Sequence, residues 1–386
     1  MIFKILLVIT EEVKNPVFLI PGAFRSRLPI DIKNTKGMKW YCSKLKKNKT
    51  LWFNPKLLIS PYVNCFLKWM RTNHKNDVYP DGFGQLNNIE NTGEIFGIKI
   101  MKYFGNIINS LERLGYKKGL NIRGAPYDWR FGAAQPESFF NNLKKAIEKE
   151  YEENNNTQIA IISHSLGGQI AHYFLTEKTT KEWRRKYIKS STMIGPSFSG
   201  RGFVLEILWK ARNDNNLKLL KNVKTFIRNL GTLHVHLPHS LGYENTTLLI
   251  DNEGNKYKGN ELIDFLTYHD VFNQKELKLA EKNFYFVRKW PEIPDINTNI
   301  LYNSGIKTPL GLNLQKKIKP VGFIKVPGDG LVGSSVMDWI CKHWNNKNIT
   351  IKCKDWRKKK QTFSHHGLIR NKRSIDVILN WILNDE

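Results

Sequence analysis

Short apolar runs and amphipathic stretches alternate along much of the chain. Runs of strand type occupy 16–20, 121–123, 159–162 and 191–194. Between them, apolar residues recur three or four positions apart, which is the spacing of a helix that buries one face. These helical stretches cover 95–114, 136–151 and the residues that follow 165. Strands that alternate with helices predict a mostly parallel central sheet flanked by helices.

The alternation fades between about 197 and 290, where the segments are irregular and rich in Asn, Gly and His. We interpret this stretch as a cap or lid inserted over the sheet, within a single domain of residues 14–386. Strand-like runs resume at 284–287, 321–324 and 348–352. A last helix is expected at 374–383.

The segment Ser163-His164-Ser165-Leu166-Gly167 joins an apolar strand directly to a helix. This context is typical of a nucleophile elbow, in which a serine hydroxyl is held out at the end of a strand. Strand and helix approach closely there, so the residues two before and two after the serine must be small. Gly167 meets this demand fully, and Ser163 meets it less well. The plainer interpretation is an ordinary strand-to-helix turn with a polar cap.

A nucleophilic Ser165 needs a histidine base and a carboxylate that orients the histidine. In α/β-hydrolases these groups follow the serine in the order acid, then histidine. Asp329 lies between two glycines after a strand-like run, and His365 and His366 precede the final helix. The catalytic groups of open α/β sheets gather at such strand exits. The residues alone leave the choice between the two histidines open.

Two further acids, Asp338 and Asp355, are weaker candidates because neither lies in a turn bounded by glycines. The serine mechanism also needs two N–H donors aimed at the developing negative charge. We expect one donor from the amide of Leu166, directly after the serine. The other is expected from the loop after the first strand, at the amide of Ala23.

The chain of 386 residues carries a formal net charge of +27. A nucleic-acid-binding protein would concentrate its basic residues on one face or in one tail. Here lysine is spread along the whole chain beside asparagine, and no nucleic-acid-binding motif is present. The composition therefore predicts a solvated basic surface and no nucleic-acid partner. Attraction to anionic lipid is a second interpretation, because each basic residue near such a surface contributes about 1 kcal/mol.

The first 13 residues form a short signal-like segment that is too short to span a bilayer. The four cysteines fall as two close pairs, Cys42 with Cys65 and Cys341 with Cys353. An even, paired pattern permits disulfides in an oxidising compartment. Their spacings fit no zinc template, so no metal site is predicted.

Several of these motifs together resemble the family of lecithin:cholesterol acyltransferase and lysosomal phospholipase A2. The resemblance covers nearly the whole chain. It rests on Phe18-Leu19-Ile20-Pro21-Gly22, on the quite specific string Ala125-Pro126-Tyr127-Asp128-Trp129-Arg130, on His164-Ser165-Leu166-Gly167, and on Gly328-Asp329-Gly330 with a late histidine. It implies an α/β-hydrolase fold with a triad of Ser165, Asp329 and His365. His365 is preferred over His366 because the family's histidine precedes an apolar pair by three and four residues, here Leu368 and Ile369.

The resemblance also implies a small membrane-binding subdomain at 40–80, closed by a disulfide between Cys42 and Cys65. Its apolar, Trp-bearing segments with interspersed lysines suit a bilayer interface, although a buried amphipathic helix is the alternative. The residues expected at the membrane are Trp52, Leu57, Leu58 and Trp69.

Two departures from the family's pattern stand out. Gly195-Pro196-Ser197 replaces a family segment next to the acyl-chain pocket, which puts that pocket in doubt. The run 284–287, taken as a strand, lacks the cysteine to which the family's second disulfide reaches, so Cys341 and Cys353 form a private bridge or none.

The resemblance implies a serine-dependent phospholipase A or O-acyltransferase that acts on glycerophospholipid esters through an acyl-enzyme. A sterol acyltransferase and a non-catalytic lipid-binding relative are the alternatives. No organic cofactor is implied. The expected setting is a secreted or lumenal, lysosome-like compartment, with peripheral attachment to a phospholipid membrane that also holds the substrate.

Overall fold

The computed structural model describes residues 14–30, 39–43, 49–52, 54, 57, 61–71, 83–86, 89, 94–95, 98–99, 103–213, 221–272, 277–315 and 322–384. The signal-like segment 1–13 and Leu58 lie outside these described residues.

A six-stranded sheet forms the centre of the molecule, in the order β14-β11-β8-β7-β1-β6. Every neighbouring pair in it is parallel. The nucleophile-elbow strand β7 therefore lies between β8 and β1, well away from both edges. The strands are β1 (Val17–Ile20), β6 (Ile122–Gly124), β7 (Ile159–His164), β8 (Ile188–Ile194), β11 (Asn297–Tyr302) and β14 (Ile351–Asp355).

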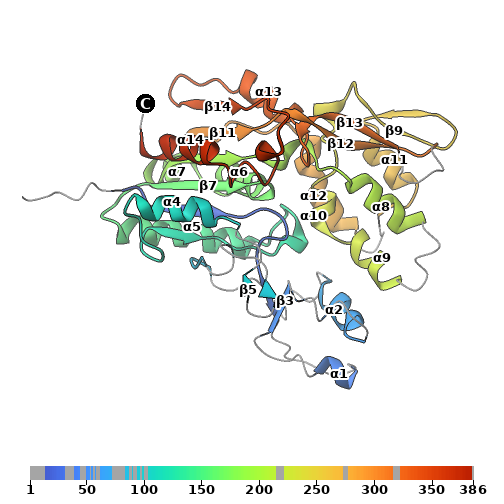
Figure 1. Ribbon diagram of the computed structural model, residues 1–386, viewed down its shortest axis with the longest axis horizontal. Coiled ribbons are helices and arrows are strands. Elements are labelled where there is room, and N and C mark those ends of the chain that lie inside the picture. Colours follow the sequence, from blue (N-terminus) through green and yellow to red (C-terminus); the bar gives the residue numbers. More distant parts are fainter. Residues whose placement is uncertain are drawn as a thin grey trace, which may run out of the picture.

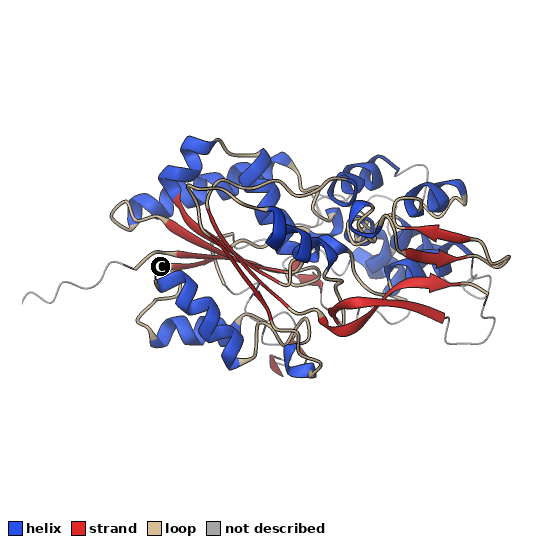
Figure 2. Cartoon of the chain, turned by 90° about the horizontal axis from the view of Figure 1, so that it is seen from above, coloured by secondary structure: helices blue, strands red, loops and turns tan. Residues whose placement is uncertain are grey.

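Helices cover both faces of this sheet, as the view from above shows (Figure 2). One face packs on α4 (Gly105–Arg113) and α14 (Lys372–Leu383). The other packs on α5 (Glu137–Glu153), α6 (Leu166–Glu177), α7 (Lys181–Tyr187) and α13 (Ser335–His343). Because successive strand residues point to opposite faces, Val17 and Leu19 of β1 join one core while Phe18 and Ile20 join the other. The predicted α/β architecture is confirmed.

A second layer of structure, at the right of Figure 1, contains a four-stranded sheet in the order β10-β9-β12-β13. Its strands are β9 (Thr247–Ile250), β10 (Lys256–Lys258), β12 (Gly305–Asn313) and β13 (Gly322–Asp329). The accompanying helices are α8 (Val204–Asn213), α9 (Lys221–Arg228), α10 (Gly231–His234), α11 (Leu262–Tyr268) and α12 (Leu277–Arg288). This cap sheet thus takes strands both from the irregular stretch 197–290 and from the hairpin that follows β11.

Three element predictions were wrong in part. The run 284–287 belongs to helix α12, where Ala280, Asn283, Phe284 and Val287 are buried at helical spacing. The strand expected at 321–324 exists as β13, but it pairs antiparallel with β12 in the cap sheet. The helix expected over 95–114 begins only at Gly105. In each case a short apolar run fits more than one element, and tertiary packing decided among them.

The segment after β1 forms a small subdomain below the main body in Figure 1. It contains β2 (Leu28–Ile30), α1 (Trp40–Ser43), β3 (Lys49–Trp52) and α2 (Val63–Trp69), with a two-stranded pair of β4 (Glu94–Ile95) and β5 (Ile98–Lys99) nearby. A disulfide joins Cys42 of α1 to Cys65 of α2, with the two Cα atoms 5.6 Å apart. The pairing implied by the family resemblance is therefore present.

Burial in this subdomain differs from the membrane-facing arrangement expected from the sequence. Trp69 is fully buried, and Leu57 is buried as well, so neither side chain is available to a bilayer. Trp52 is half-buried. The amphipathic segment around α2 turns its apolar side chains inward, which was the alternative interpretation. Among the described residues, no helix is long and apolar enough to cross a membrane.

Arg130 fastens the subdomain to the main body. It lies in the 3-10 helix η3 (Trp129–Phe131) and is fully buried. Its Nε donates to the Asp128 carboxylate at 2.9 Å, and its Nη1 donates to the carbonyl oxygens of Trp69 at 2.8 Å and Arg71 at 3.1 Å. A buried guanidinium needs this full set of partners, because an unpaired buried charge is costly. The Asp-Trp-Arg string is thus a structural clamp between η3 and the end of α2.

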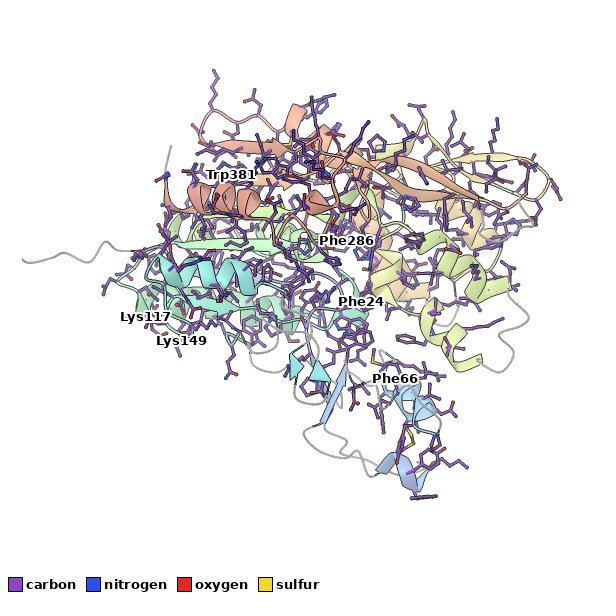
Figure 3. All side chains as sticks on the ribbon, viewed as in Figure 1. Phe24, Phe66, Lys117, Lys149, Phe286 and Trp381 are labelled. Atoms are coloured by element: carbon purple, nitrogen blue, oxygen red, sulfur yellow. A yellow bond between two sulfur atoms is a disulfide. The ribbon has the colours of Figure 1, made fainter. Side chains whose placement is uncertain are left out.

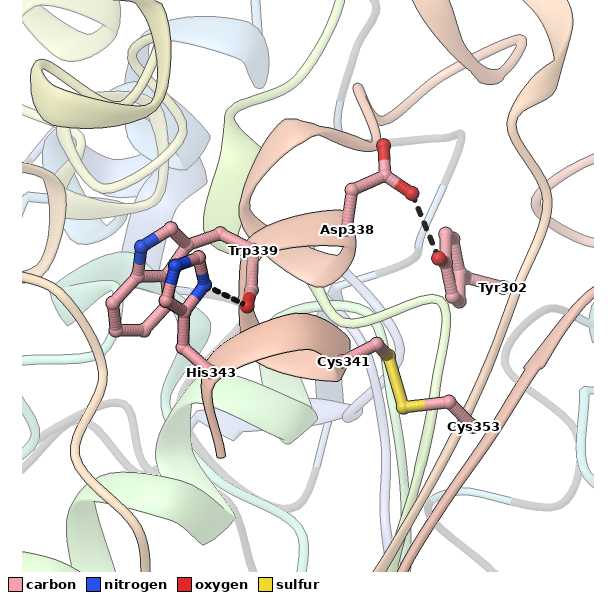
Figure 4. Close-up of a disulfide and its surroundings, with 6 residues drawn as sticks. All are labelled: Tyr302, Asp338, Trp339, Cys341, His343 and Cys353. Carbon is pink, nitrogen blue, oxygen red and sulfur yellow. Dashed lines mark hydrogen bonds between the residues drawn. A yellow bond between two sulfur atoms is a disulfide. The ribbon is translucent and has the colours of Figure 1, made fainter. Parts of the chain in front are cut away.

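A second disulfide joins Cys341 of α13 to Cys353 of β14 (Figure 4). Nearby on the same helix, Asp338 accepts a hydrogen bond of 2.7 Å from the Tyr302 hydroxyl at the end of β11. Helix α13 is therefore fixed both to the edge strand and to its neighbour. The sequence had left this bridge open.

We predict that Arg130→Met lowers the free energy of unfolding by about 3–5 kcal/mol, because it removes the guanidinium that pairs with the buried Asp128 carboxylate and donates to the carbonyl oxygens of Trp69 and Arg71. Urea unfolding measures this. Lys372→Gln is the matched control: it breaks an exposed pair with Asp376 and should cost less than about 1 kcal/mol. Equal losses in the two variants would contradict the clamp.

Candidate active site

The turn between β7 and α6 holds Ser165 in an uncommon backbone conformation, with φ of 58° and ψ of −125°. Such a positive φ is strained for a residue with a side chain and is tolerated where the surroundings enforce it. The surroundings here are tight. A Cβ at Gly167 would collide with the carbonyl oxygens of Ile20 and Pro21, and one at Gly22 would lie 2.9 Å from the Ser165 Cβ. The sharp strand-to-helix turn expected of a nucleophile elbow is therefore present.

A buried hydrogen-bonded pair of Asp329 and His365 lies at the same edge of the sheet. The Asp329 Oδ2 is 2.7 Å from the His365 Nδ1, and the His365 amide donates to the Asp329 carbonyl at 3.1 Å. The other carboxylate oxygen accepts from the amides of Leu331 at 3.0 Å and Val332 at 2.8 Å. Both side chains are almost fully buried. The carboxylate is thus fixed by backbone donors and presents one oxygen to the imidazole.

The chain reaches Asp329 by a different route from the one expected. Its strand β13 is not part of the central sheet. Instead, the chain leaves the carboxyl end of β11, runs out along β12 and returns along β13, so that Gly305 pairs with Gly328. This hairpin returns the last residue of β13, Asp329, to the point where β11 ended. The acid therefore comes from the cap sheet yet lies at the carboxyl edge of the central one.

Several contacts connect this pair to the serine turn. The Ser165 amide donates to the carbonyl of Ile194 at 3.0 Å, and a Cβ on the next residue, Gly195, would lie 3.3 Å from both the Asp329 Oδ2 and the His365 Nδ1. The His164 Nε2 is 3.0 Å from the His365 carbonyl oxygen. No hydrogen bond between the Ser165 hydroxyl and the His365 ring occurs among the described residues. The structure thus gathers the three candidates at one edge and joins two of them directly.

The alternative histidine and acids are engaged elsewhere. The His366 Nε2 lies 3.5 Å from the guanidinium of Arg25. Burial, then the charge of neighbouring His365, lowers the pKa of His366 to about 3. Asp338 accepts from Tyr302 and Ser334. Asp355 accepts from the hydroxyl of Ser304 at 2.6 Å. The geometry therefore favours His365 and Asp329.

The two expected oxyanion donors are available. In the described part of the chain, the amides of Ala23 and Leu166 donate to no acceptor, whereas the Gly22 amide donates to the Tyr103 hydroxyl at 2.9 Å. Leu166 is the first residue of α6, where helix amides have no partner within the helix. Both amides are therefore able to donate hydrogen bonds to an oxygen that becomes negatively charged between them.

Tyr103 is a site residue that the sequence analysis missed. Its hydroxyl bonds both the Gly22 amide and the Nδ1 of His164, so it links the loop after β1 to the residue before Ser165. Burial raises the pKa of Tyr103, and it lowers the pKa of His164 well below its usual value. Tyr103 lies just before α4 in no recognisable motif, so only the fold brings it to the site.

Trp52 contacts the site from the small subdomain. Its indole N–H donates to the Phe24 carbonyl at 3.0 Å, and its ring packs on Phe24 and Trp129. Phe24 follows Ala23 directly and lies between the main body and the subdomain (Figure 3). Trp52, expected at a membrane, is thus tied to the loop that carries the Ala23 amide. The described residues also contain no cluster of three or more His, Cys, Asp or Glu side chains arranged to hold a metal ion.

Comparison with known proteins identifies the family of this chain. The model of the lecithin:cholesterol acyltransferase family matches residues 48–279. The chain belongs to the lecithin:cholesterol acyltransferase family. It is 24% identical over 313 residues to the lysosomal phospholipase A and acyltransferase of Bos taurus, covering 77% of this chain and 74% of that protein. It is 26% identical over 350 residues to the phosphatidylcholine-sterol acyltransferase of Gallus gallus, covering 86% and 82%.

A solved structure of the Tle4–Tli4 complex contains a chain with the same fold as this family member. The TM-score is 0.57 at 12% identity, and the match covers 97% of this chain and 100% of that one. At so low an identity the likeness concerns the fold alone.

Five buried histidines and the partly buried His366 make stability depend on pH. In each of them burial is the first cause that lowers the pKa below 6.5: to about 4 in His172, His234 and His239, to about 3 in His236 and His366, and well below its usual value in His164. Because the pKa of each histidine is lower in the folded state than in the unfolded chain, these side chains do not destabilise the folded state above pH 6.5. The unfolded chain binds more protons below that pH.

We predict that the free energy of unfolding falls as the pH drops from 6.5 toward 4, by about 1.4 kcal/mol per pH unit for each histidine protonated on unfolding. Urea unfolding across this range measures the slope. His234→Gln, in the cap, should lower the slope by one histidine's share. A stability that does not change over this range would contradict the neutral burial of these side chains.

Proposed function

We propose that this chain is a serine-dependent phospholipase A and O-acyltransferase that moves an acyl group from a glycerophospholipid to water or an alcohol. The observation that carries the proposal is the buried Asp329–His365 hydrogen bond beside the Ser165 turn. Family membership supports the substrate class, since the curated relatives are named as phospholipases and acyltransferases.

In the first half-reaction, the Ser165 Oγ attacks the ester carbonyl carbon while the His365 Nε2 takes the hydroxyl proton. Asp329 holds the Nδ1–H, which leaves Nε2 free to accept that proton. The tetrahedral oxyanion forms between the amides of Ala23 and Leu166. When the intermediate collapses, the C–O bond to the lysophospholipid breaks. His365 then returns its proton to the departing oxygen, and the acyl group stays on Ser165.

In the second half-reaction, water or an alcohol loses a proton to His365 and attacks the acyl-enzyme carbonyl. The second oxyanion collapses, the bond to the Ser165 Oγ breaks, and that oxygen recovers the proton. Water gives a free fatty acid, and an alcohol gives a new ester. The two outcomes share every residue named here, so the acceptor is decided by which hydroxyl reaches the acyl-enzyme.

The small subdomain is the proposed membrane contact, and Trp40 is the residue proposed to enter the bilayer interface. Trp40 is 70% exposed on α1, directly beside the Cys42–Cys65 bridge. An exposed indole next to a rigid cross-link suits the headgroup region of a bilayer. Trp52 would not touch the membrane and would instead link the subdomain to the active-site loop, through its hydrogen bond to the Phe24 carbonyl. Two disulfides fit a secreted or lumenal compartment, with peripheral attachment to the membrane.

Ser165→Ala should lower kcat on phosphatidylcholine by at least about 10³-fold, because the acyl-enzyme cannot form. The variant should also lose labelling by a fluorophosphonate probe. Ser163→Ala is the matched control, since this hydroxyl bonds only the Thr192 carbonyl, at 3.4 Å, among the described residues. It should keep most of the activity. A near-normal rate in Ser165→Ala would rule out the assignment, and a folded, probe-inert wild type would favour a non-catalytic lipid binder.

Trp40→Ala should weaken binding to phosphatidylcholine vesicles by about 10- to 100-fold, since loss of one interfacial indole removes about 1.5–3 kcal/mol of favourable burial free energy. Vesicle sedimentation measures this, and hydrolysis of a soluble short-chain ester should change little. Tyr268→Ala on the cap removes an aromatic side chain that is 85% exposed and serves as the control. If Tyr268→Ala weakens binding as much as Trp40→Ala, the contact surface is not the subdomain.

A further inference from the structure

Arg201 is a partly buried cation at the candidate active site with no counter-ion in contact. Among the residues that the structure describes, its guanidinium makes no hydrogen bond and no ion pair. It lies over the ring of Phe24, with its Cζ 5.7 Å from the ring centroid. Phe24 directly follows Ala23, the proposed oxyanion donor. The side chain of Arg201 therefore reaches the loop that borders the reacting ester.

The backbone of Arg201 is held firmly against the acid of the site. Its amide donates to the His236 carbonyl at 2.9 Å, and it forms a bridge with Val332. Val332 in turn donates its amide to the Asp329 carboxylate. Arg201 is thus placed by the same turn that orients Asp329, and its position follows from the catalytic geometry.

Asp329 attracts this arginine electrostatically but forms no ion pair with it. Its Oδ2 is bonded to His365 and its Oδ1 to the two amides of the turn, and no contact of ion-pair length joins it to Arg201. A second cation, Arg25, lies nearby over the ring of Tyr103 at 5.2 Å. Burial, and then the charge of Arg25, lowers the pKa of Arg201. The charge of Arg25 disfavours the positive charge of Arg201, and an anion held beside both guanidinium groups would offset this repulsion.

We propose that Arg201, supported by Arg25, binds the phosphodiester of the acyl donor, and so selects phospholipids over neutral esters. This deepens the proposed function and rests on it. Guanidinium groups recognise phosphate oxygens through paired N–H donors. In a glycerophospholipid only the glycerol unit separates the phosphate from the scissile ester. A phosphate beside the Ser165 turn is therefore expected to fall within reach of a cation above Phe24.

The test compares phosphatidylcholine with a diacylglycerol of the same acyl chains, both in the same neutral detergent micelles. In Arg201→Gln, the ratio of kcat/KM for phosphatidylcholine to that for diacylglycerol should fall about 10- to 100-fold, as for the loss of a charged hydrogen bond. Arg201→Lys should recover part of the ratio, because it restores the charge without the paired donors. An unchanged ratio in Arg201→Gln would overturn the proposal.

Arg185→Gln is the matched control, because Arg185 is exposed at the end of α7, just before the amino end of β8. It removes one positive charge far from the site, and its ratio should equal that of the wild type. If Arg185→Gln lowers the ratio as much as Arg201→Gln, general surface charge is the cause and the proposal fails.

A binding experiment separates this proposal from the proposed function and distinguishes two sources of phosphate. Thermal unfolding of Ser165→Ala is followed with glycerophosphocholine or with inorganic phosphate. We expect glycerophosphocholine to raise the midpoint, and this rise to be lost when Arg201→Gln is added. A rise with inorganic phosphate alone would indicate a free-phosphate site and overturn the headgroup assignment. No rise with either would overturn the anion site. If the wild type hydrolyses neither lipid, the proposed function fails, while this binding result still decides the site.

Discussion

The hydrogen bond between Asp329 and His365 joins the parts of this molecule that matter for its chemistry. Asp329 ends a strand of the cap sheet, whereas His365 precedes the last helix of the main body. The same carboxylate also fixes the 330–332 turn through two amides. Because that turn also holds the backbone of Arg201, one buried carboxylate helps to position both the imidazole and this arginine. The four-stranded sheet thus contributes a residue to the candidate site.

A second, neutral network supports the serine turn. Tyr103, Gly22 and His164 form a connected set of buried hydrogen bonds, which continues from His164 to the His365 carbonyl. Such a network is stable only when its members are satisfied and uncharged, and burial lowers the pKa of His164 accordingly. In this network the Gly22 amide donates to Tyr103, whereas the Ala23 amide has no acceptor among the described residues. The Ala23 amide is therefore available for the proposed role of oxyanion donor.

The small subdomain is coupled to the site by a short chain of contacts. Arg130 clamps the end of α2 to η3, and Trp52 packs on Phe24 and Trp129 while its indole N–H donates to the Phe24 carbonyl. The Cys42–Cys65 bridge and these contacts thus connect α1, which carries the exposed Trp40, to the loop that carries Ala23. The proposed membrane contact at Trp40 would therefore be connected through packed residues to the loop of the proposed oxyanion donor.

The sequence by itself determined those features that depend on local patterns. The elbow around Ser165, the Gly-bounded acid and the parallel strands follow from apolar periodicity, small residues and chain order, and the structure agrees with them. Tertiary structure decided the rest. Whether Trp69 faced a membrane or the core depended on what packs against α2, and the run 284–287 became helical because its buried positions fit α12. Tyr103 and Arg201 lie in no motif, since their roles arise from neighbours far away in the chain, which only the folded chain brings together.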